Sequence, residues 1–176
     1  MQFILKNPAI LVILIYLPQL ILMFTSKRFS KNFNNTISNS KKDYLLEILT
    51  GLILAGILIY GYFSFLTNEK VYLVLGGGIY LFGIVLTYLG YFQFLFSEKY
   101  FVQEGVFRIS RNPTYFFTSV AMMGICVLIN SFILFLFVVL HFVFTHFIIL
   151  KEEKYLERKF GKQYLNYKKM VARYLG

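Results

Sequence analysis

Two polar clusters in the second half of the chain, separated by a long apolar run, carry most of the side chains that could do chemistry. The first runs from Arg111 through Asn112 and Pro113 to Tyr115. Asn112 suits the N-cap of a helix and Pro113 its first turn. A helix N-terminus also presents free N–H groups to an anion, and Arg111 beside it adds a forked donor that suits a carboxylate. The cluster therefore predicts a helix start that can also bind an anion.

The second cluster begins with Lys151, Glu152 and Glu153, directly after the apolar run. In one interpretation, the two carboxylates only offset the basic residues that follow on an exposed helix. In the other, they form part of a binding site at the membrane boundary. Adjacent helical residues point about 100° apart, so at most one of the two carboxylates is expected to face a given cavity.

The composition places these clusters in an integral membrane protein. The 176 residues are 58% hydrophobic and 20% aromatic, with a formal net charge of +10, and this apolar share is too large for a soluble domain. The basic residues flank apolar runs, which favours contact with lipid headgroups over binding to nucleic acid. A single cysteine, Cys126, excludes an intramolecular disulfide and a Cys-rich metal site.

The apolar runs predict an all-α membrane bundle of about five transmembrane helices. Each run is long enough to cross a hydrocarbon core of ~30 Å, and the longest needs a turn at Asn130 and Ser131 to form two spans. The runs are Phe3 to Phe24, Tyr44 to Leu66, Val71 to Phe96 and Tyr115 to Leu150. The 176 residues are expected to form one membrane domain.

An amphipathic interfacial helix is expected at the C-terminal end. Apolar and aromatic side chains recur there at helical spacing, namely Leu156, Phe160, Tyr164, Tyr167 and Val171. Gly161 is the expected point of interruption. The pattern favours Tyr164 and Tyr167 as anchors at the membrane interface over a role as ligands.

Two histidines fall inside the last apolar run. His141 and His146 are five residues apart, so they do not share a helix face as a metal-binding pair would. Ionisable side chains within a span usually face a cavity or the bundle interior. We therefore expect both to line a cavity, with His141 the deeper of the two.

The distribution of Lys and Arg predicts the orientation in the membrane. The segment 25–43 carries five of them, the segment 97–114 carries three and the residues after 150 carry eight, whereas the other loops carry Lys70 alone. Basic loops stay on the cytoplasmic side. The N-terminus is therefore predicted outside, and the C-terminus and both polar clusters are predicted at the cytoplasmic face.

Together, the two clusters resemble the signature segments of the isoprenylcysteine carboxyl methyltransferase and phospholipid N-methyltransferase family of integral membrane enzymes. The resemblance covers roughly residues 71–176, which leaves residues 1–70 as an N-terminal helical scaffold. The positions that match the family's pattern are Gly105, Arg108, Arg111, Asn112, Pro113, Tyr115, Glu152, Glu153, Phe160, Gly161, Tyr164 and Tyr167.

The resemblance implies a methyltransferase that uses S-adenosyl-L-methionine. It implies that the cofactor is bound by the first cluster (Arg111, Asn112, Pro113, Tyr115), by Glu152 and Glu153, and by the loosely matched Gly76 and Gly78. Lys151 and Glu153 are the expected catalytic residues. Arg111 suits the carboxylate of the cofactor's amino-acid end, and either glutamate suits its ammonium group.

The glycines Gly76, Gly77, Gly78 and Gly83 also have a simpler interpretation. Small residues in membrane helices most often allow close packing between helices, and this is the favoured interpretation.

The sequence departs from the family's pattern at three places. Asn112 stands where the carboxyl methyltransferases usually have His, and this difference argues against their substrate class for this protein. Phe117 and Thr118 replace a glycine, so the first turn there is bulkier. Lys151 replaces Arg, which keeps the charge but loses the fork.

The methyl acceptor stays open. A prenylcysteine carboxylate, a phospholipid amine, a small thiol and an isoprenoid all fit a lipidic or amphiphilic acceptor that enters from the bilayer, and the oligomeric state is open too. Two other functions are the alternatives. One is an NADPH-dependent membrane reductase of the sterol-reductase type, and the other is a non-enzymatic scaffold or small transporter, which gives no reason for the glutamate pair.

Overall fold

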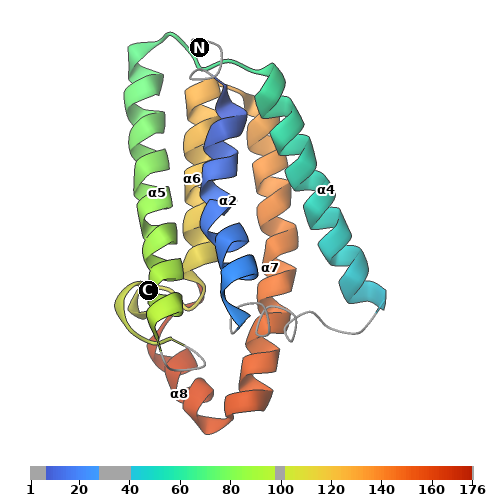
Figure 1. Ribbon diagram of the computed structural model, residues 1–176, viewed down its shortest axis with the longest axis vertical. Coiled ribbons are helices and arrows are strands. Elements are labelled where there is room, and N and C mark those ends of the chain that lie inside the picture. Colours follow the sequence, from blue (N-terminus) through green and yellow to red (C-terminus); the bar gives the residue numbers. More distant parts are fainter. Residues whose placement is uncertain (1–6, 28–40, 98–101, 176) are drawn as a thin grey trace.

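The computed structural model describes residues 7–27, 41–97 and 102–175, and within them the chain is a helical bundle (Figure 1). No strand occurs in these ranges. The elements are α2 (Pro8–Thr25), α4 (Lys41–Phe63), α5 (Lys70–Phe96), a 3-10 turn η1 (Gly105–Arg108), α6 (Pro113–Ile129), α7 (Phe132–Phe160) and α8 (Lys162–Met170). The start of the first predicted span and much of the first basic loop lie outside the described residues.

The prediction of about five membrane helices is confirmed. Helices α2, α4, α5 and α7 are long and apolar enough to cross a membrane, and the shorter apolar α6 completes the bundle. The turn expected between α6 and α7 is present. Asn130 ends α6 in a left-handed conformation at φ 54°, and the Ser131 side chain caps α7 by accepting a hydrogen bond from the Leu134 amide at 3.2 Å.

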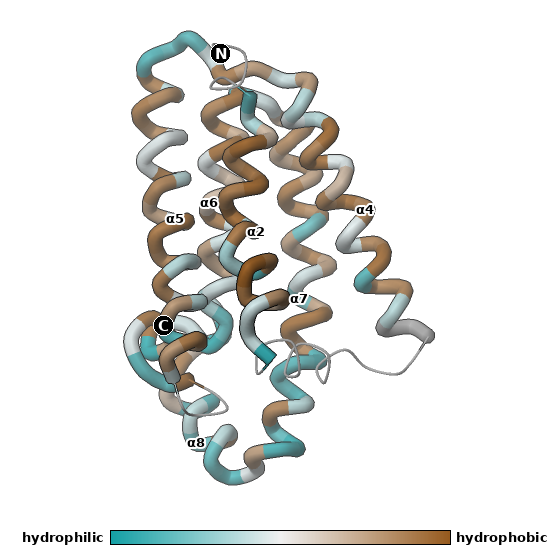
Figure 2. The backbone as a smooth tube through the Cα atoms, in the orientation of Figure 1, coloured by the Kyte–Doolittle hydropathy of each residue, from teal (hydrophilic) through white to brown (hydrophobic). Residues whose placement is uncertain are grey.

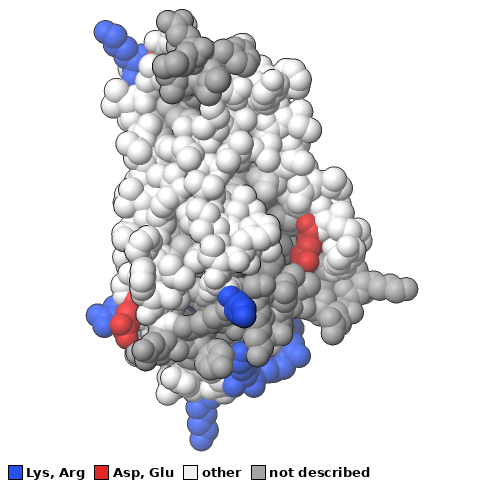
Figure 3. Space-filling view, viewed as in Figure 1, with Lys and Arg blue, Asp and Glu red and all other residues white. Residues whose placement is uncertain are grey.

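Both polar clusters lie at the same end of the bundle. Helices α2, α5 and α7 run in one direction and α4 and α6 in the other, so α7 ends where α6 begins (Figure 1). The hydrophilic part of the backbone gathers at this end around α8, while the spans are mostly hydrophobic (Figure 2). Most of the Lys and Arg side chains visible in Figure 3 are also at this end.

Close packing of α5 on α6 depends on small residues. A Cβ atom added to Gly76 would lie 2.8 Å from the Leu128 amide nitrogen and 2.9 Å from the Gly124 carbonyl oxygen, which is too close for any real contact. Gly83 meets the backbone of Ala121 in the same way. The backbones of the two helices therefore touch, as is common where small residues face each other in membranes.

Replacing Gly76 by alanine is expected to destabilise the protein by ~1–3 kcal/mol, because the helices must move apart. Gly78→Ala is the matched control, since an added Cβ meets nothing within 4 Å among the described residues, and its effect should stay below about 1 kcal/mol. Thermal unfolding followed by circular dichroism would compare them, since the chain has no tryptophan. Equal unfolding temperatures for the two variants would contradict the packing role of Gly76.

The aromatic side chains of α8 are not exposed at a membrane interface, contrary to the expectation from the sequence. Gly161, at φ 51°, breaks the helix at the expected place, and α8 follows it. Tyr164 and Tyr167 are 2% and 3% exposed, and the Tyr167 hydroxyl donates a hydrogen bond to the Phe107 carbonyl at 2.6 Å. The expectation that these tyrosines anchor the protein at the membrane interface is therefore wrong, because their side of α8 packs onto the protein itself.

Candidate functional site

A buried ionic network connects the two polar clusters, with Glu153 at its centre. Glu153 is 2% exposed. Its Oε1 accepts a hydrogen bond from Asn112 Nδ2 at 3.0 Å and lies 3.2 Å from the guanidinium of Arg111. Arg173 binds both carboxylate oxygens, at 3.1 and 2.9 Å. The bond to Glu153 raises the pKa of the Arg173 guanidinium, so this charge persists at any physiological pH.

The segment that follows α8 completes this network from the other side. The Arg111 amide donates to the Ala172 carbonyl at 3.0 Å, and the Ser110 hydroxyl donates to the Arg173 carbonyl at 3.0 Å. The Arg111 guanidinium donates further to the Lys168 carbonyl at 2.8 Å. The two terminal nitrogens of the fork that the sequence suggested for a ligand's carboxylate therefore contact groups of the protein, whereas Arg111 Nε has no hydrogen-bond partner among the described residues.

The helix start predicted at Asn112 and Pro113 is present, but Asn112 does not cap it with its side chain. Pro113 is the first residue of α6 and Asn112 occupies the N-cap position, with no side-chain capping bond. The Asn112 amide group binds Glu153 instead. This residue therefore links the start of α6 to α7.

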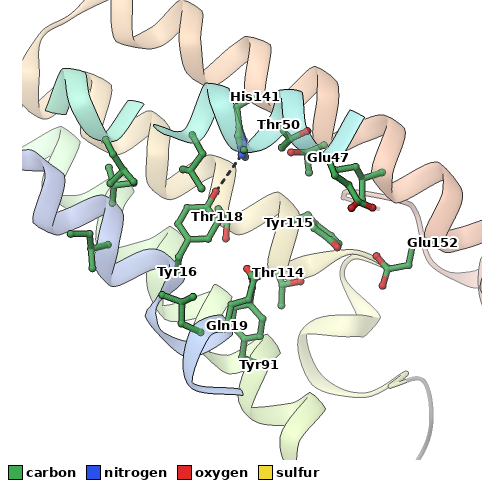
Figure 4. Close-up of a pocket in the computed structure, with 18 of the residues that line it drawn as sticks. Tyr16, Gln19, Glu47, Thr50, Tyr91, Thr114, Tyr115, Thr118, His141 and Glu152 are labelled. Carbon is green, nitrogen blue, oxygen red and sulfur yellow. Dashed lines mark hydrogen bonds between the residues drawn. The ribbon is translucent and has the colours of Figure 1, made fainter. Parts of the chain in front are cut away.

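A cavity of about 470 Å³ is lined by residues of α2, α4, α5, α6 and α7 (Figure 4). Of the residues expected to form the site, Tyr115, Lys151 and Glu152 line it. The Tyr115 hydroxyl points toward the Glu152 carboxylate. Glu152 Oε2 is buried and has no hydrogen-bond partner among the described residues. A volume in this range is typical of small-molecule sites.

The side chains of the two adjacent glutamates thus lie in different surroundings. Glu152 faces the cavity and Glu153 faces the network, as expected from the ~100° between neighbouring helical residues. A buried carboxylate oxygen without a partner is costly, and a cationic group that enters the cavity would satisfy it.

Several of the expected site residues are not brought to the cavity. Arg111, Asn112, Pro113 and Glu153 are not among its described lining residues. Gly76 and Gly78 do not line it either. They lie near the opposite end of α5, where Gly76 packs against α6.

Much of the cavity wall comes from the first half of the chain, which the motifs did not reveal. Polar lining residues from α2, α4 and α5 are Tyr16, Gln19, Glu47, Thr50 and Tyr91 (Figure 4). Glu47 is the one residue of this group that the sequence could have indicated, because an acidic residue within an apolar run usually has a function. The others are isolated polar residues that are also common in packed membrane helices.

The two histidines have different positions. His141 lines the cavity, as expected from the sequence. His146 is not among the described lining residues, and its ring is hydrogen-bonded through Nδ1 to the Tyr174 hydroxyl. The expectation is therefore confirmed for His141, whereas His146 lies on the side of α7 that meets the C-terminal segment.

Comparison with known proteins gives one match. A family model described as phospholipid methyltransferase matches residues 71–163, from the start of α5 to the start of α8. No curated protein and no solved structure matches the chain. The matched region contains the first polar cluster and the start of the second, with Lys151, Glu152 and Glu153, whereas α2 and α4 lie outside it. Because the match covers more than half of the chain, the protein belongs to the phospholipid methyltransferase family.

Proposed function

We propose that the protein is a membrane-embedded methyltransferase that uses S-adenosyl-L-methionine to methylate a lipidic or amphiphilic acceptor. The observation that carries the proposal is Glu152, whose unpartnered carboxylate oxygen lies in the wall of a membrane cavity. The family match supports the reaction class. The cavity then holds both the cofactor and the acceptor.

The lining residues suit the cofactor. Its amino-acid end is a zwitterion, and Glu152 would hold the ammonium group while Lys151 supplies a positive charge for the carboxylate. Tyr91 and Tyr115 add aromatic surface for the adenosine end. The bound cofactor supplies an electrophilic methyl group on a sulfonium ion. The protein's contribution is to orient both reactants and exclude water.

The buried network would act by positioning rather than by contact. Glu153 and Arg111 fix the rotation of α7 and its distance from α6, because Asn112 and Arg111 both bind Glu153 across the two helices. This arrangement keeps Glu152 and Tyr115 turned into the same cavity. We therefore place Glu153, expected from the sequence to be catalytic, among the positioning residues, and keep Lys151 as a residue of the cavity.

An acceptor would reach the cavity from the bilayer, between α2 and α4. Lining residues on these two helices are also exposed at the outer surface, namely Ile13 (51%) and Leu20 (48%) on α2 and Gly51 on α4. The corresponding residues on α6 and α7 are buried or half-buried. Figure 3 shows the molecule hollowed on the face between α2 and α4. The opening between α2 and α4 is flanked by apolar side chains, which suits the passage of a hydrocarbon chain.

The active site would face the cytoplasm. The end of the bundle that holds Glu152 also holds α8, with its Lys162, Lys168 and Lys169, whereas Lys70 lies at the other end. By the positive-inside rule, the N-terminus would lie outside and the C-terminus inside.

Isothermal titration in detergent tests the proposal. S-adenosylhomocysteine, the product form of the cofactor, is expected to bind with a dissociation constant in the micromolar range, about −8 kcal/mol. NADPH is the comparison ligand, and it should not bind measurably at the same concentration. Absence of S-adenosylhomocysteine binding at millimolar ligand would overturn the proposal, and binding of NADPH alone would favour a reductase.

A further inference from the structure

The cavity contains a second polar region, deeper in the bundle than Glu152. His141 and Thr145 lie one turn apart on α7, line the cavity and are 6% and 4% exposed. His141 Nδ1 and Thr145 Oγ1 are buried, with no hydrogen-bond partner among the described residues. Buried polar atoms are nearly always hydrogen-bonded, and in a membrane no bulk water can replace the partner.

The histidine ring is held from the opposite wall. The Tyr16 hydroxyl on α2 lies 3.4 Å from His141 Nε2, which is the contact drawn in Figure 4. This contact involves Nε2 and leaves Nδ1 without a hydrogen-bond partner among the described residues. Two unpartnered polar atoms and a supporting tyrosine on facing helices therefore form a ready-made subsite for a hydrogen-bonding group.

This deeper region has no charge of its own. The charged residues among the described cavity lining are Glu47, Lys151 and Glu152, and all three belong to the end of the bundle where α4 begins and α7 ends. Thr145 and His141 precede Glu152 by seven and eleven residues, or roughly 10 and 16 Å along the helix axis. A charged group at this depth would lack a counter-ion, so the subsite suits an uncharged group.

We propose that Tyr16, His141 and Thr145 bind an uncharged hydrogen-bonding group of the methyl acceptor, such as a hydroxyl or a neutral amine on a hydrocarbon body. The inference rests on the proposed function and names its substrate class. The acceptor is a compact lipid-soluble molecule that enters the membrane-interior part of the cavity, rather than a lipid whose polar group is a charged headgroup at the surface.

The adenine ring of the cofactor is the other uncharged hydrogen-bonding group that could reach this depth. The position favours the acceptor, because Tyr16 lies on the same helix as Ile13 and Leu20, which flank the opening to the bilayer. The two sources are separated by measuring acceptor binding and cofactor binding on the same variants.

The probes are two photoactivatable C16 chains of equal length, one that carries a hydroxyl and one that carries no polar group. Crosslinking to the full-length protein in lipid nanodiscs is measured with each probe. The wild-type protein is expected to label more strongly with the alcohol than with the hydrocarbon by about two- to tenfold, the ratio that one buried hydrogen bond gives. Crosslinked peptides should come from α2, α4 and α7.

Two variants remove the polar atoms and keep the shape, namely Thr145→Val and His141→Phe. Both should reduce the alcohol preference to about one, with the affinity for S-adenosylhomocysteine unchanged within about twofold. Thr87→Val is the matched control, since Thr87 is also a fully buried threonine with an unpartnered hydroxyl among the described residues, but it does not line the cavity. It should keep the preference. If one variant fails to fold, Tyr16→Phe replaces it and should weaken the preference in part.

Equal labelling of the wild type by alcohol and hydrocarbon would overturn the inference. So would variants that lose S-adenosylhomocysteine affinity while keeping the alcohol preference, because the subsite would then belong to the cofactor. Failure of the proposed function is read separately, from the absence of S-adenosylhomocysteine binding to the wild type, since the probes report binding without turnover.

Discussion

Replacing Glu152 by glutamine is expected to weaken S-adenosylhomocysteine binding by about ten- to hundredfold and to leave the thermal stability unchanged or slightly higher. Hydrogen bonds to a charged group contribute ~1.5–3 kcal/mol, which corresponds to this range of affinity. Stability should not fall, because Glu152 Oε2 has no hydrogen-bond partner among the described residues that the substitution could remove. Glutamine also removes the cost of burying a charge.

Titration calorimetry on the purified variant measures the affinity, and circular dichroism on the same sample measures the unfolding temperature. Glu157→Gln is the control, because Glu157 lies on the same helix and pairs with Lys168 outside the cavity. Its affinity should match that of the wild type. Wild-type affinity in Glu152→Gln would show that the cofactor's ammonium group is held elsewhere.

Glu153→Gln is expected to have the opposite profile, with a loss of ~3–5 kcal/mol in the free energy of unfolding, because one partner of a buried ion pair is removed. Arg111 is nearly buried, with 6% of its side chain exposed, and would lose the charge 3.2 Å away. Arg173 would lose its two-oxygen contact. At a temperature where the variant is still folded, its cofactor affinity should fall less than that of Glu152→Gln.

A double variant tests the electrostatic origin of this loss. Adding Arg111→Met to Glu153→Gln removes the unpaired charge, so the double variant should recover part of the stability. Chemical or thermal unfolding in detergent gives both values. A double variant that is less stable than the sum of the two single changes would contradict the interpretation, and so would a Glu153→Gln protein as stable as the wild type.

The contrast between these two glutamates shows what the sequence could predict and what it could not. Helical geometry predicts that only one of them faces a cavity, and this is the case. Which one faces it depends on the rotation of α7 about its axis. That rotation is fixed by contacts from Asn112 and Arg173, which are 41 and 20 residues away in the chain. No local pattern reports such contacts.

The same dependence on distant contacts explains why the partners of Arg111 and the burial of the two tyrosines of α8 could not be predicted. Their residue types suit a ligand's carboxylate and a membrane interface, and both properties are local. Their actual partners are distant in the chain, because Arg111 binds the Lys168 carbonyl in α8 and Tyr167 in α8 binds the Phe107 carbonyl in η1. By contrast, the number of spans and the turn at Asn130 follow from local apolar length and could be predicted.

The cavity wall was predictable only in part. His141 was expected to line a cavity because an ionisable residue within a span is costly. Tyr16 and Thr50 are weakly polar residues that apolar helices tolerate, so they gave no signal. They became candidates only when the packing of α2 and α4 against α7 was known.

Glu152 faces the cavity and Glu153 faces the network, and this difference limits how the length of α7 can change in evolution. One inserted residue between Thr145 and Glu152 would turn the rest of the helix by about 100°, which would bring Glu152 to the direction of the network and turn Glu153 away from both the network and the cavity. An insertion of about seven residues, close to two whole turns, would restore the facing but lengthen the helix by ~10 Å. We therefore expect homologous genes to keep the spacing between Thr145 and Glu152, even where the loops at the helix ends vary in length.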